Sequence, residues 1–154
     1  MPRRLVILVL AFALLTGGAT ALAKPLKGTN GPDRLIGTAQ ADKLNGRAGD
    51  DDLRGGPGND RLTGGSGSDI VSGDAGNDSL SGGPGGDTLL GGSGADRIDA
   101  RGGPRDVVLG GDGRDRIEAA DGARDKISCG AGRDTVRADR IDTVARDCET
   151  VKRG

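Results

Sequence analysis

The chain of 154 residues contains no Trp, Tyr or His, and its only Phe is Phe12. A conventional globular core is built from large apolar and aromatic side chains, so this sequence has little material for one. The absence of His removes the usual general base and any catalytic triad that depends on it. The net charge is −1, from 22 basic and 23 acidic residues. With no basic stripe and no aromatic side chains for base stacking, nucleic acid is not an expected partner.

Several common ligand motifs are also absent. Gly-x-Gly-x-x-Gly strings occur among the glycines, but no βαβ unit surrounds them, and there is no Gly-Lys-Ser/Thr phosphate loop. Asp50-Asp51-Asp52 lacks the Gly and the bidentate Glu of an EF-hand loop. Paired carboxylates leave glycoside cleavage formally open, but no unit stands out as a cleft and the aromatic platforms that hold sugars are missing. We therefore predict no catalytic residues and no enzymatic activity.

The N-terminus has the features of a secretory leader. Two arginines precede the apolar run Leu5–Leu15, and Ala21–Ala23 supplies a small-residue cleavage pattern. A retained membrane anchor is the alternative, but the run is shorter than the roughly 20 residues that span a bilayer. We predict a signal peptide at residues 1–23, and a secreted, extracellular mature chain that begins at Lys24 and has no membrane span.

Glycine is abundant instead, with 31 residues, and aspartates recur with a fixed period. Aspartate stands at every ninth position in eight successive units: Asp33, Asp42, Asp51, Asp60, Asp69, Asp78, Asp87 and Asp96. The rhythm continues at spacings of eight to ten residues through Asp106, Asp115, Asp125, Asp134 and Asp142. An aliphatic residue follows two positions after each aspartate, from Leu35 to Val144. A low-complexity coil with solvated turn aspartates is the alternative, but disorder would not maintain this pairing.

The clearest unit is Gly55-Gly56-Pro57-Gly58-Asn59-Asp60-Arg61-Leu62-Thr63. It resembles the hemolysin-type calcium-binding repeats of RTX proteins, G-G-x-G-x-D-x-U-x with U aliphatic. Thirteen such units span residues 28–145. The resemblance implies an all-β fold, a parallel β-roll (a β-helix solenoid) in which two units close one turn of about eighteen residues, hence about six and a half turns. It also implies several Ca²⁺ ions, each lying between a loop and the loop two units later.

Each residue type in the unit has a local physical reason. Gly at positions 1, 2 and 4 permits a positive φ and a tight turn, and the Asp-x-U-x segment can extend with its aliphatic residue facing inward. Burying one aliphatic side chain contributes only about 1.5–3 kcal/mol, whereas ordering the backbone costs about 1–2 kcal/mol per residue. Stacked aspartates would also repel each other. We therefore expect the fold to depend on Ca²⁺, which takes about six to eight oxygen ligands, and the chain to be disordered without it.

The resemblance places the aspartates in two rows. One contains Asp42, Asp60, Asp78, Asp96, Asp115 and Asp134, and the other contains Asp33, Asp51, Asp69, Asp87, Asp106, Asp125 and Asp142. The first units depart from the pattern and are candidates for an N-terminal cap. Our hypothesis is that the second row loses its ions beyond Asp87, with Arg105, Arg124 or Arg140 supplying positive charge instead. We predict the following calcium ligands: Asp51, Asp60, Asp69, Asp78, Asp87, Asp96, Asp115 and Asp134.

Cys129 and Cys148 are the only cysteines. In an exported chain such a pair favours a disulfide, two free thiols being the alternative. Their separation of 19 residues is close to one turn, so we expect them on neighbouring rungs. The disulfide would contribute around 3 kcal/mol in the chain-entropy model, and would tie residues 146–154 onto the last turn as a C-terminal cap. This C-terminal segment resembles the end of small exported actinobacterial calcium-binding proteins.

The predicted organisation is a signal peptide at 1–23, a lead-in at 24–27, a calcium-binding β-roll at 28–145 and a cap at 146–154. Three functions remain open. The first is a stand-alone extracellular calcium-binding module with a structural or surface role. The second is an adhesion module that binds cell-surface or matrix polysaccharide through exposed Arg, Asp, Ser and Thr side chains. The third is a polysaccharide-acting enzyme of the β-helix type.

Overall fold

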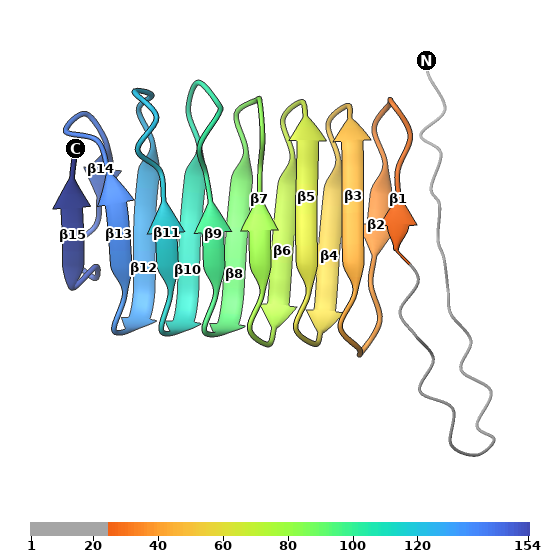
Figure 1. Cartoon of the computed structure of the whole chain (residues 1–154), viewed down its shortest axis with the longest axis horizontal. Coiled ribbons are helices and arrows are strands. Elements are labelled where there is room, and N and C mark those ends of the chain that lie inside the picture. Colours follow the sequence, from red (N-terminus) through yellow and green to blue (C-terminus); the bar gives the residue numbers. More distant parts are fainter. Residues whose placement is uncertain (1–24) are drawn as a thin grey trace.

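The structure is a computed structural model that describes residues 25–154, so the predicted signal peptide lies outside the described residues. Every regular element from residue 25 onward is a β-strand, and no helix in this part is long and apolar enough to cross a membrane. The strands follow one another along the roll (Figure 1). Their bounds are β1 (Leu26–Lys27), β2 (Arg34–Ile36), β3 (Lys43–Ala48), β4 (Asp52–Pro57), β5 (Arg61–Ser66), β6 (Ile70–Ala75), β7 (Ser79–Ser81), β8 (Thr88–Gly94), β9 (Arg97–Asp99), β10 (Val107–Gly113), β11 (Arg116–Glu118), β12 (Lys126–Gly132), β13 (Thr135–Ala138), β14 (Thr143–Val144) and β15 (Thr150–Arg153).

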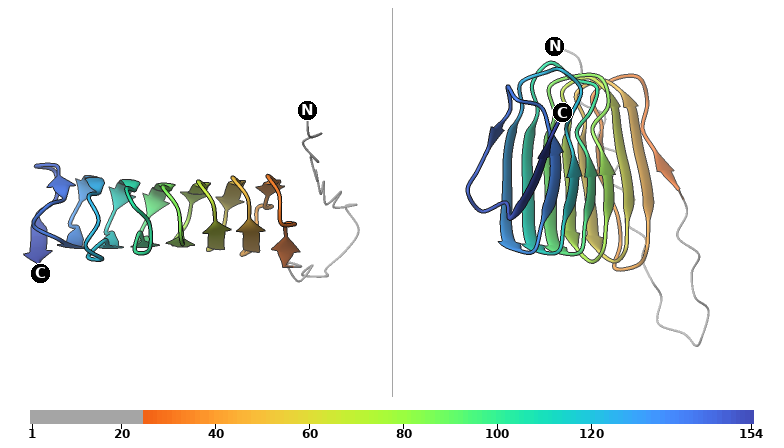
Figure 2. Two further views of the ribbon diagram at one scale, coloured as in Figure 1. Left: turned by 90° about the horizontal axis from the view of Figure 1, so that it is seen from above. Right: turned by 60° about the vertical axis from the view of Figure 1, so that its left-hand side comes forward.

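The strands form two sheets that face each other. The odd-numbered strands make an eight-stranded sheet and the even-numbered strands a seven-stranded sheet, here called the odd sheet and the even sheet. Each strand pairs in parallel with the strand two further along, so Leu44 lies beside Leu62 and Leu62 beside Leu80. This offset of one turn per two units confirms the predicted parallel β-roll, and the two flat layers are visible in Figure 2. About seven turns result, slightly more than expected, because β1 and β15 add pairings outside the thirteen units.

The interior consists of two ladders of aliphatic side chains. In β5, Leu62 and Gly64 point inward while Arg61 and Thr63 point outward, and the other strands repeat this alternation. The unit's aliphatic residue is almost completely buried in twelve of the thirteen units: Leu35, Leu44, Leu53, Leu62, Val71, Leu80, Leu89, Ile98, Val108, Ile117, Ile127 and Val136. Only glycines and small residues such as Ala100 fill the other inward positions. The protein core is therefore thin, as the composition indicates.

The glycines of a unit have two different roles. Positions 2 and 4 do take a positive φ, for example 93° at Gly56 and 145° at Gly58. Position 1 does not, and the expectation of a positive φ there is wrong. A Cβ atom at Gly55 would instead overlap the carboxylate of Asp60, in the same unit, and the backbone of the next turn. Position 1 is glycine because the carboxylate occupies the space that a side chain would need.

Odd strands run in the opposite direction to even strands, so the loops lie on two edges of the roll (Figure 1). Loops from an odd strand to the next even strand form the upper edge in Figure 1, and loops from an even strand to the next odd strand form the lower edge. Asp51 and Asp69 lie in upper loops, whereas Asp60 and Asp78 lie in lower loops. The two edges are the places where the repeated aspartates gather.

Candidate metal centre

All thirteen unit aspartates are buried, with exposed fractions of 1–7%. The upper loops bring together the row that contains Asp33, Asp51, Asp69, Asp87, Asp106, Asp125 and Asp142. The lower loops bring together the row that contains Asp42, Asp60, Asp78, Asp96, Asp115 and Asp134. The eight aspartates predicted as ligands are thus inside these two columns, each with its row neighbour on the adjacent turn.

One oxygen of each carboxylate is held by the neighbouring turn. The Oδ1 atom of Asp69 accepts a hydrogen bond from the backbone N–H of Asp51 at 2.9 Å. In the lower row, Oδ1 of Asp78 accepts from the N–H of Asp60 at 2.7 Å. The same contact recurs from Asp51 to Asp142 along both rows. Each carboxylate is therefore fixed in direction before any ligand is considered.

The second oxygen has no protein donor. Oδ2 is buried and has no hydrogen-bond partner in ten aspartates: Asp51, Asp60, Asp69, Asp78, Asp87, Asp96, Asp106, Asp115, Asp125 and Asp134. An unpartnered buried carboxylate oxygen is energetically costly, and native proteins contain few of them. Calcium is a hard cation that takes carboxylate and backbone carbonyl oxygens together. Columns of free carboxylate oxygens beside glycine-rich turns fit that donor set.

Burial raises the pKa of these carboxyl groups. The pKa of Asp51, Asp69, Asp78 and Asp115 rises to about 6, and that of Asp106 to about 7. Desolvation is the largest cause, and the hydrogen bond from the neighbouring backbone N–H opposes it. Other aspartates of the row raise the pKa further, as Asp87 and Asp125 do for Asp106. The protein atoms alone therefore disfavour the charged form, which a bound cation would favour.

The family model for the RTX calcium-binding nonapeptide repeat (four copies) matches residues 27–62, 48–80, 63–98, 81–103 and 105–136. The chain belongs to this family. No curated protein matches the sequence. The aspartate rows of this RTX protein are the repeat's aspartates, and the family assignment supports Ca²⁺ as the cation. The last turn, with Cys148 and Glu149, lies beyond the matched residues.

The first RTX unit of each row ends the column with protein donors. The Oδ2 atom of Asp42 accepts from the N–H of Thr38 at 2.6 Å and from its Oγ1 at 2.8 Å. Thr29 makes the same pair of contacts with Asp33. Threonine stands at position 2 in both units, where most later units have glycine. These threonines occupy the carboxylate oxygen that is free in the units from Asp51 onward.

The upper row changes beyond Asp87, but not in the way expected. Asp106 and Asp125 keep a buried, unpartnered Oδ2 atom. The exposed Arg105, Arg124 and Arg140 form none of the ion pairs found within residues 25–154. The hypothesis that an arginine pairs with these aspartates in place of the ion is therefore wrong. The carboxylates that sequence reasoning missed here serve the longer loops, as the next contacts show.

Asp121 and Asp139 form a second column outside the upper row. Asp121 accepts a hydrogen bond from the N–H of Gly102 at 2.7 Å, and Asp139 accepts from the N–H of Asp121 at 2.9 Å. The N–H of Asp139 in turn donates to Oδ2 of Asp142, so the upper row also ends on a protein donor. The spacing of 18 residues between Asp121 and Asp139 is the sequence signal that could have revealed this column.

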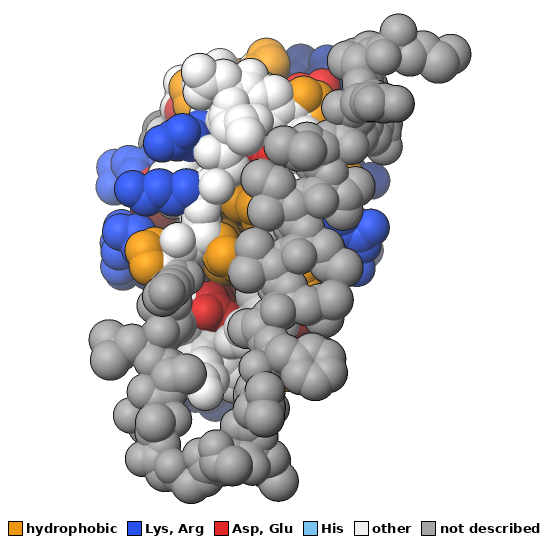
Figure 3. All heavy atoms as spheres, turned by 90° about the vertical axis from the view of Figure 1, so that its right-hand side faces the viewer, with side chains coloured by type: hydrophobic (Ala, Val, Ile, Leu, Met, Phe, Trp, Pro, Cys, Tyr) orange, Lys and Arg blue, Asp and Glu red, His pale blue; other side chains and the backbone are white. Residues whose placement is uncertain are grey.

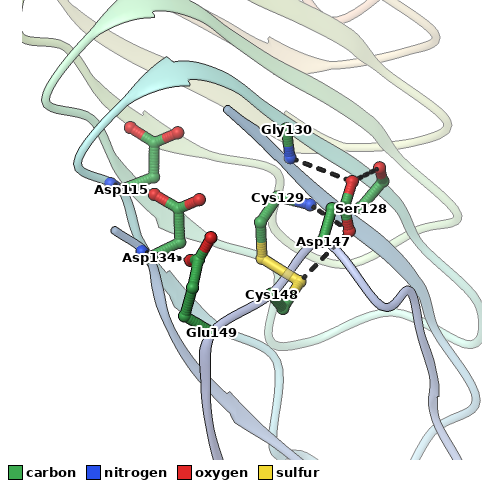
Figure 4. The surroundings of a disulfide bond; sticks show 8 residues. All are labelled: Asp115, Ser128, Cys129, Gly130, Asp134, Asp147, Cys148 and Glu149. Atoms are coloured by element: carbon green, nitrogen blue, oxygen red, sulfur yellow. Dashed lines mark hydrogen bonds between the residues drawn. A yellow bond between two sulfur atoms is a disulfide. The ribbon is translucent and has the colours of Figure 1, made fainter. Parts of the chain in front are cut away.

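The predicted disulfide is present and joins Cys129 to Cys148, with their Cα atoms 5.1 Å apart (Figure 4). Asp147 accepts hydrogen bonds from Oγ of Ser128 at 2.6 Å and from the N–H of Gly130 at 3.1 Å. The Ser128 hydrogen bond is the main cause that lowers the pKa of Asp147. Asp147 lies within 4.8 Å of both sulfur atoms, but the disulfide already uses them. This cluster is therefore a structural clasp rather than a metal site.

Proposed function

We propose that this RTX chain is an extracellular calcium-binding protein with a structural or surface role, in which the ions hold the β-roll folded. The observation that carries the proposal is the set of ten buried, unpartnered carboxylate oxygens in two columns. The predicted ligands Asp51, Asp60, Asp69, Asp78, Asp87, Asp96, Asp115 and Asp134 would hold the ions, and Asp106 and Asp125 offer the same free oxygen. Bound calcium supplies the positive charge that makes a column of carboxylates stable.

The same reasoning connects folding to export. Extracellular modules often bind calcium at about 10⁻⁴–10⁻³ M, far above cytosolic levels. Because binding and folding are coupled, the chain would stay unfolded inside the cell and fold outside it. The thin interior of Leu, Ile and Val is consistent with this dependence, since it leaves little stabilisation besides the ions.

Circular dichroism of the purified protein, titrated with CaCl₂, tests the proposal. We expect a cooperative gain of β signal with CaCl₂ and little with MgCl₂, because Mg²⁺ requires octahedral geometry and retains its waters. Asp69→Asn should raise the calcium midpoint about tenfold or more, since a charged ligand is lost. Asp52→Asn is the matched control, because Asp52 lies on the outer face of β4 beside Arg34 and Arg54. Identical β structure in excess chelator would contradict the proposal.

A second function, polysaccharide binding, is favoured by one feature of the odd sheet. Lys43 pairs in register with Arg61, and Arg97 with Arg116, all exposed on its outer face with Ser79 between the two pairs. Figure 3 shows that Lys and Arg side chains flank the roll on both sides. A column of cations with hydroxyl neighbours suits an acidic cell-surface or matrix polysaccharide. Binding to acidic glycans on a glycan array, lost in Arg97→Ser with Arg116→Ser, would support this function.

A further inference from the structure

Glu149 takes the place of an aspartate at the end of the lower row, although no repeat unit contains it. Its Oε2 atom accepts a hydrogen bond from the backbone N–H of Asp134 at 2.8 Å. Asp134 makes the same contact one turn earlier, where its Oδ1 accepts from the N–H of Asp115 at 2.8 Å. Figure 4 shows the three carboxylates stacked one above the other. The contact ladder of the lower row therefore continues by one carboxylate beyond the matched repeats.

The strand register explains why Glu149 reaches this position. Thr150 pairs with Thr135 across β15 and β13, as Thr135 pairs with Arg116 across β13 and β11. The N–H of Thr150 donates to the carbonyl oxygen of Asp134 at 3.2 Å, matching the bond from Thr135 to Asp115 at 2.9 Å. Glu149 directly precedes Thr150, so it stands at the register position of a unit aspartate. It does so only 15 residues after Asp134, because the intervening turn is shorter.

Asp134 supplies an independent indication that a ligand belongs here. Its side chain is 1% exposed, and its Oδ2 atom has no hydrogen-bond partner. At the N-terminal end of the same row, Thr38 donates to the corresponding oxygen of Asp42. At the C-terminal end, the neighbouring turn brings Glu149, an acceptor, instead of a donor. Two carboxylates on adjacent turns, one with a buried free oxygen, require positive charge rather than another acceptor.

We propose that Asp134 and Glu149 form a terminal calcium site at the C-terminal rim, and that the Cys129–Cys148 disulfide positions Glu149 in it. This proposal rests on the calcium-binding function proposed above. Cys148 is joined directly to Glu149, and Asp147 is bound to Ser128 and Gly130 of β12, so two residues beside Glu149 are attached to the preceding turn. Glu149 itself is exposed, so the rim site binds calcium more weakly than the enclosed sites and fills last.

Native mass spectrometry of the purified protein at rising CaCl₂ concentrations counts the bound ions. Glu149→Gln keeps an oxygen that can accept the Asp134 N–H bond but removes the charge, so it separates capping from metal binding. We expect this variant to bind one ion fewer than the wild type, with the tighter ions and the β signal unchanged. Glu118→Gln is the control, because Glu118 is the only other glutamate and pairs with Arg116 on the outer face of β11.

Cys129→Ala with Cys148→Ala tests the positioning role. The chain itself carries alanine at the corresponding inward position in Ala100, Ala119 and Ala138, so the substitution is compatible with the fold. We expect the weakest calcium step to weaken by about 10-fold to 100-fold, the range seen when outer-shell partners of metal ligands are removed, while the tighter steps stay unchanged.

Two outcomes would overturn the terminal site. In the first, Glu149→Gln binds as many ions as the wild type with the same affinity. In the second, Glu149→Gln loses several ions together with β structure, which would make Glu149 a cap of the fold and not a ligand. A wild-type protein that binds no calcium would instead refute the proposed function, so the two failures are distinguishable.

Discussion

At the scale of single residues, the unit separates two reasons for being glycine. Gly65 has a φ of 122°, a conformation that side chains with a Cβ rarely adopt. Gly64 has no such backbone requirement, but a Cβ atom there would overlap the carboxylate of Asp69. The first glycine of the unit is therefore coupled to the metal-binding aspartate, and the second to the local turn.

A double-mutant cycle should reveal this difference. Gly64→Ala and Gly65→Ala should each destabilise the calcium-bound protein by about 1–3 kcal/mol, through overpacking and backbone strain respectively. With Asp69→Ala in the background, Gly64→Ala should cost much less, because the overlapping carboxylate is gone, while Gly65→Ala should cost the same. Thermal unfolding at saturating CaCl₂ measures all four effects. Equal coupling of both glycines to Asp69 would refute the assignment.

At the scale of elements, the first and last turns differ from the turns between them. Thr29 and Thr38 supply hydroxyl and amide donors to Asp33 and Asp42, whereas the lower row ends on the acceptor Glu149. The N-terminal units are thus closed by the protein's own hydrogen bonds. Their stability should depend less on calcium than that of the turns from Asp51 onward.

Thr38→Val tests the N-terminal closure. The substitution keeps the backbone N–H bond to Asp42 but removes the hydroxyl donor, so we expect a loss of about 0.5–1.5 kcal/mol in unfolding free energy, with an unchanged calcium count. Thr63→Val is the control, because Thr63 lies on the outward face of β5. Thermal unfolding compares the two variants. Equal effects in both would show that the Thr38 hydroxyl has no special role.

The period of the sequence was enough to predict the roll, its two aspartate rows and the disulfide, since identical units can only stack in register. What the period could not predict depends on exceptions to it. Glu149 lies outside the nine-residue rhythm, so only strand pairing reveals its place. Asp121 and Asp139 lie in units of altered length, and the contact between Gly64 and Asp69 needs the folded loop. Distances across turns, not residue types, determine these features.

At the scale of the whole molecule, the buried carboxyl groups make the calcium-free roll sensitive to pH. An ordinary unfolded Asp has a pKa of about 3.9, whereas in the fold Asp69 and Asp78 reach about 6 and Asp106 about 7. The folded state therefore binds more protons than the unfolded state between these values. The stabilisation is fully present below about pH 4 and is lost as the pH rises through about 6–7.

We therefore expect calcium-free protein to gain β structure as the pH is lowered from 8 towards 5, because protons neutralise the columns in place of the cation. In the presence of CaCl₂, the calcium midpoint should rise over the same interval, since protons and calcium compete for the same oxygens. Circular dichroism with and without CaCl₂ at each pH measures both trends. A calcium-free β signal that falls on acidification would contradict the assignment of buried, neutral carboxyl groups.

The register of 18 residues between paired strands has a consequence for how such a chain can change its length. Loss of residues 64–81 would place Gly82 where Gly64 stood and Asp87 where Asp69 stood, and each would meet partners of the same kind. A tandem duplication of the same stretch of gene would lengthen the protein by one rung just as simply. Evolution can therefore adjust this molecule in whole rungs while the threonine end and the disulfide end are inherited unaltered.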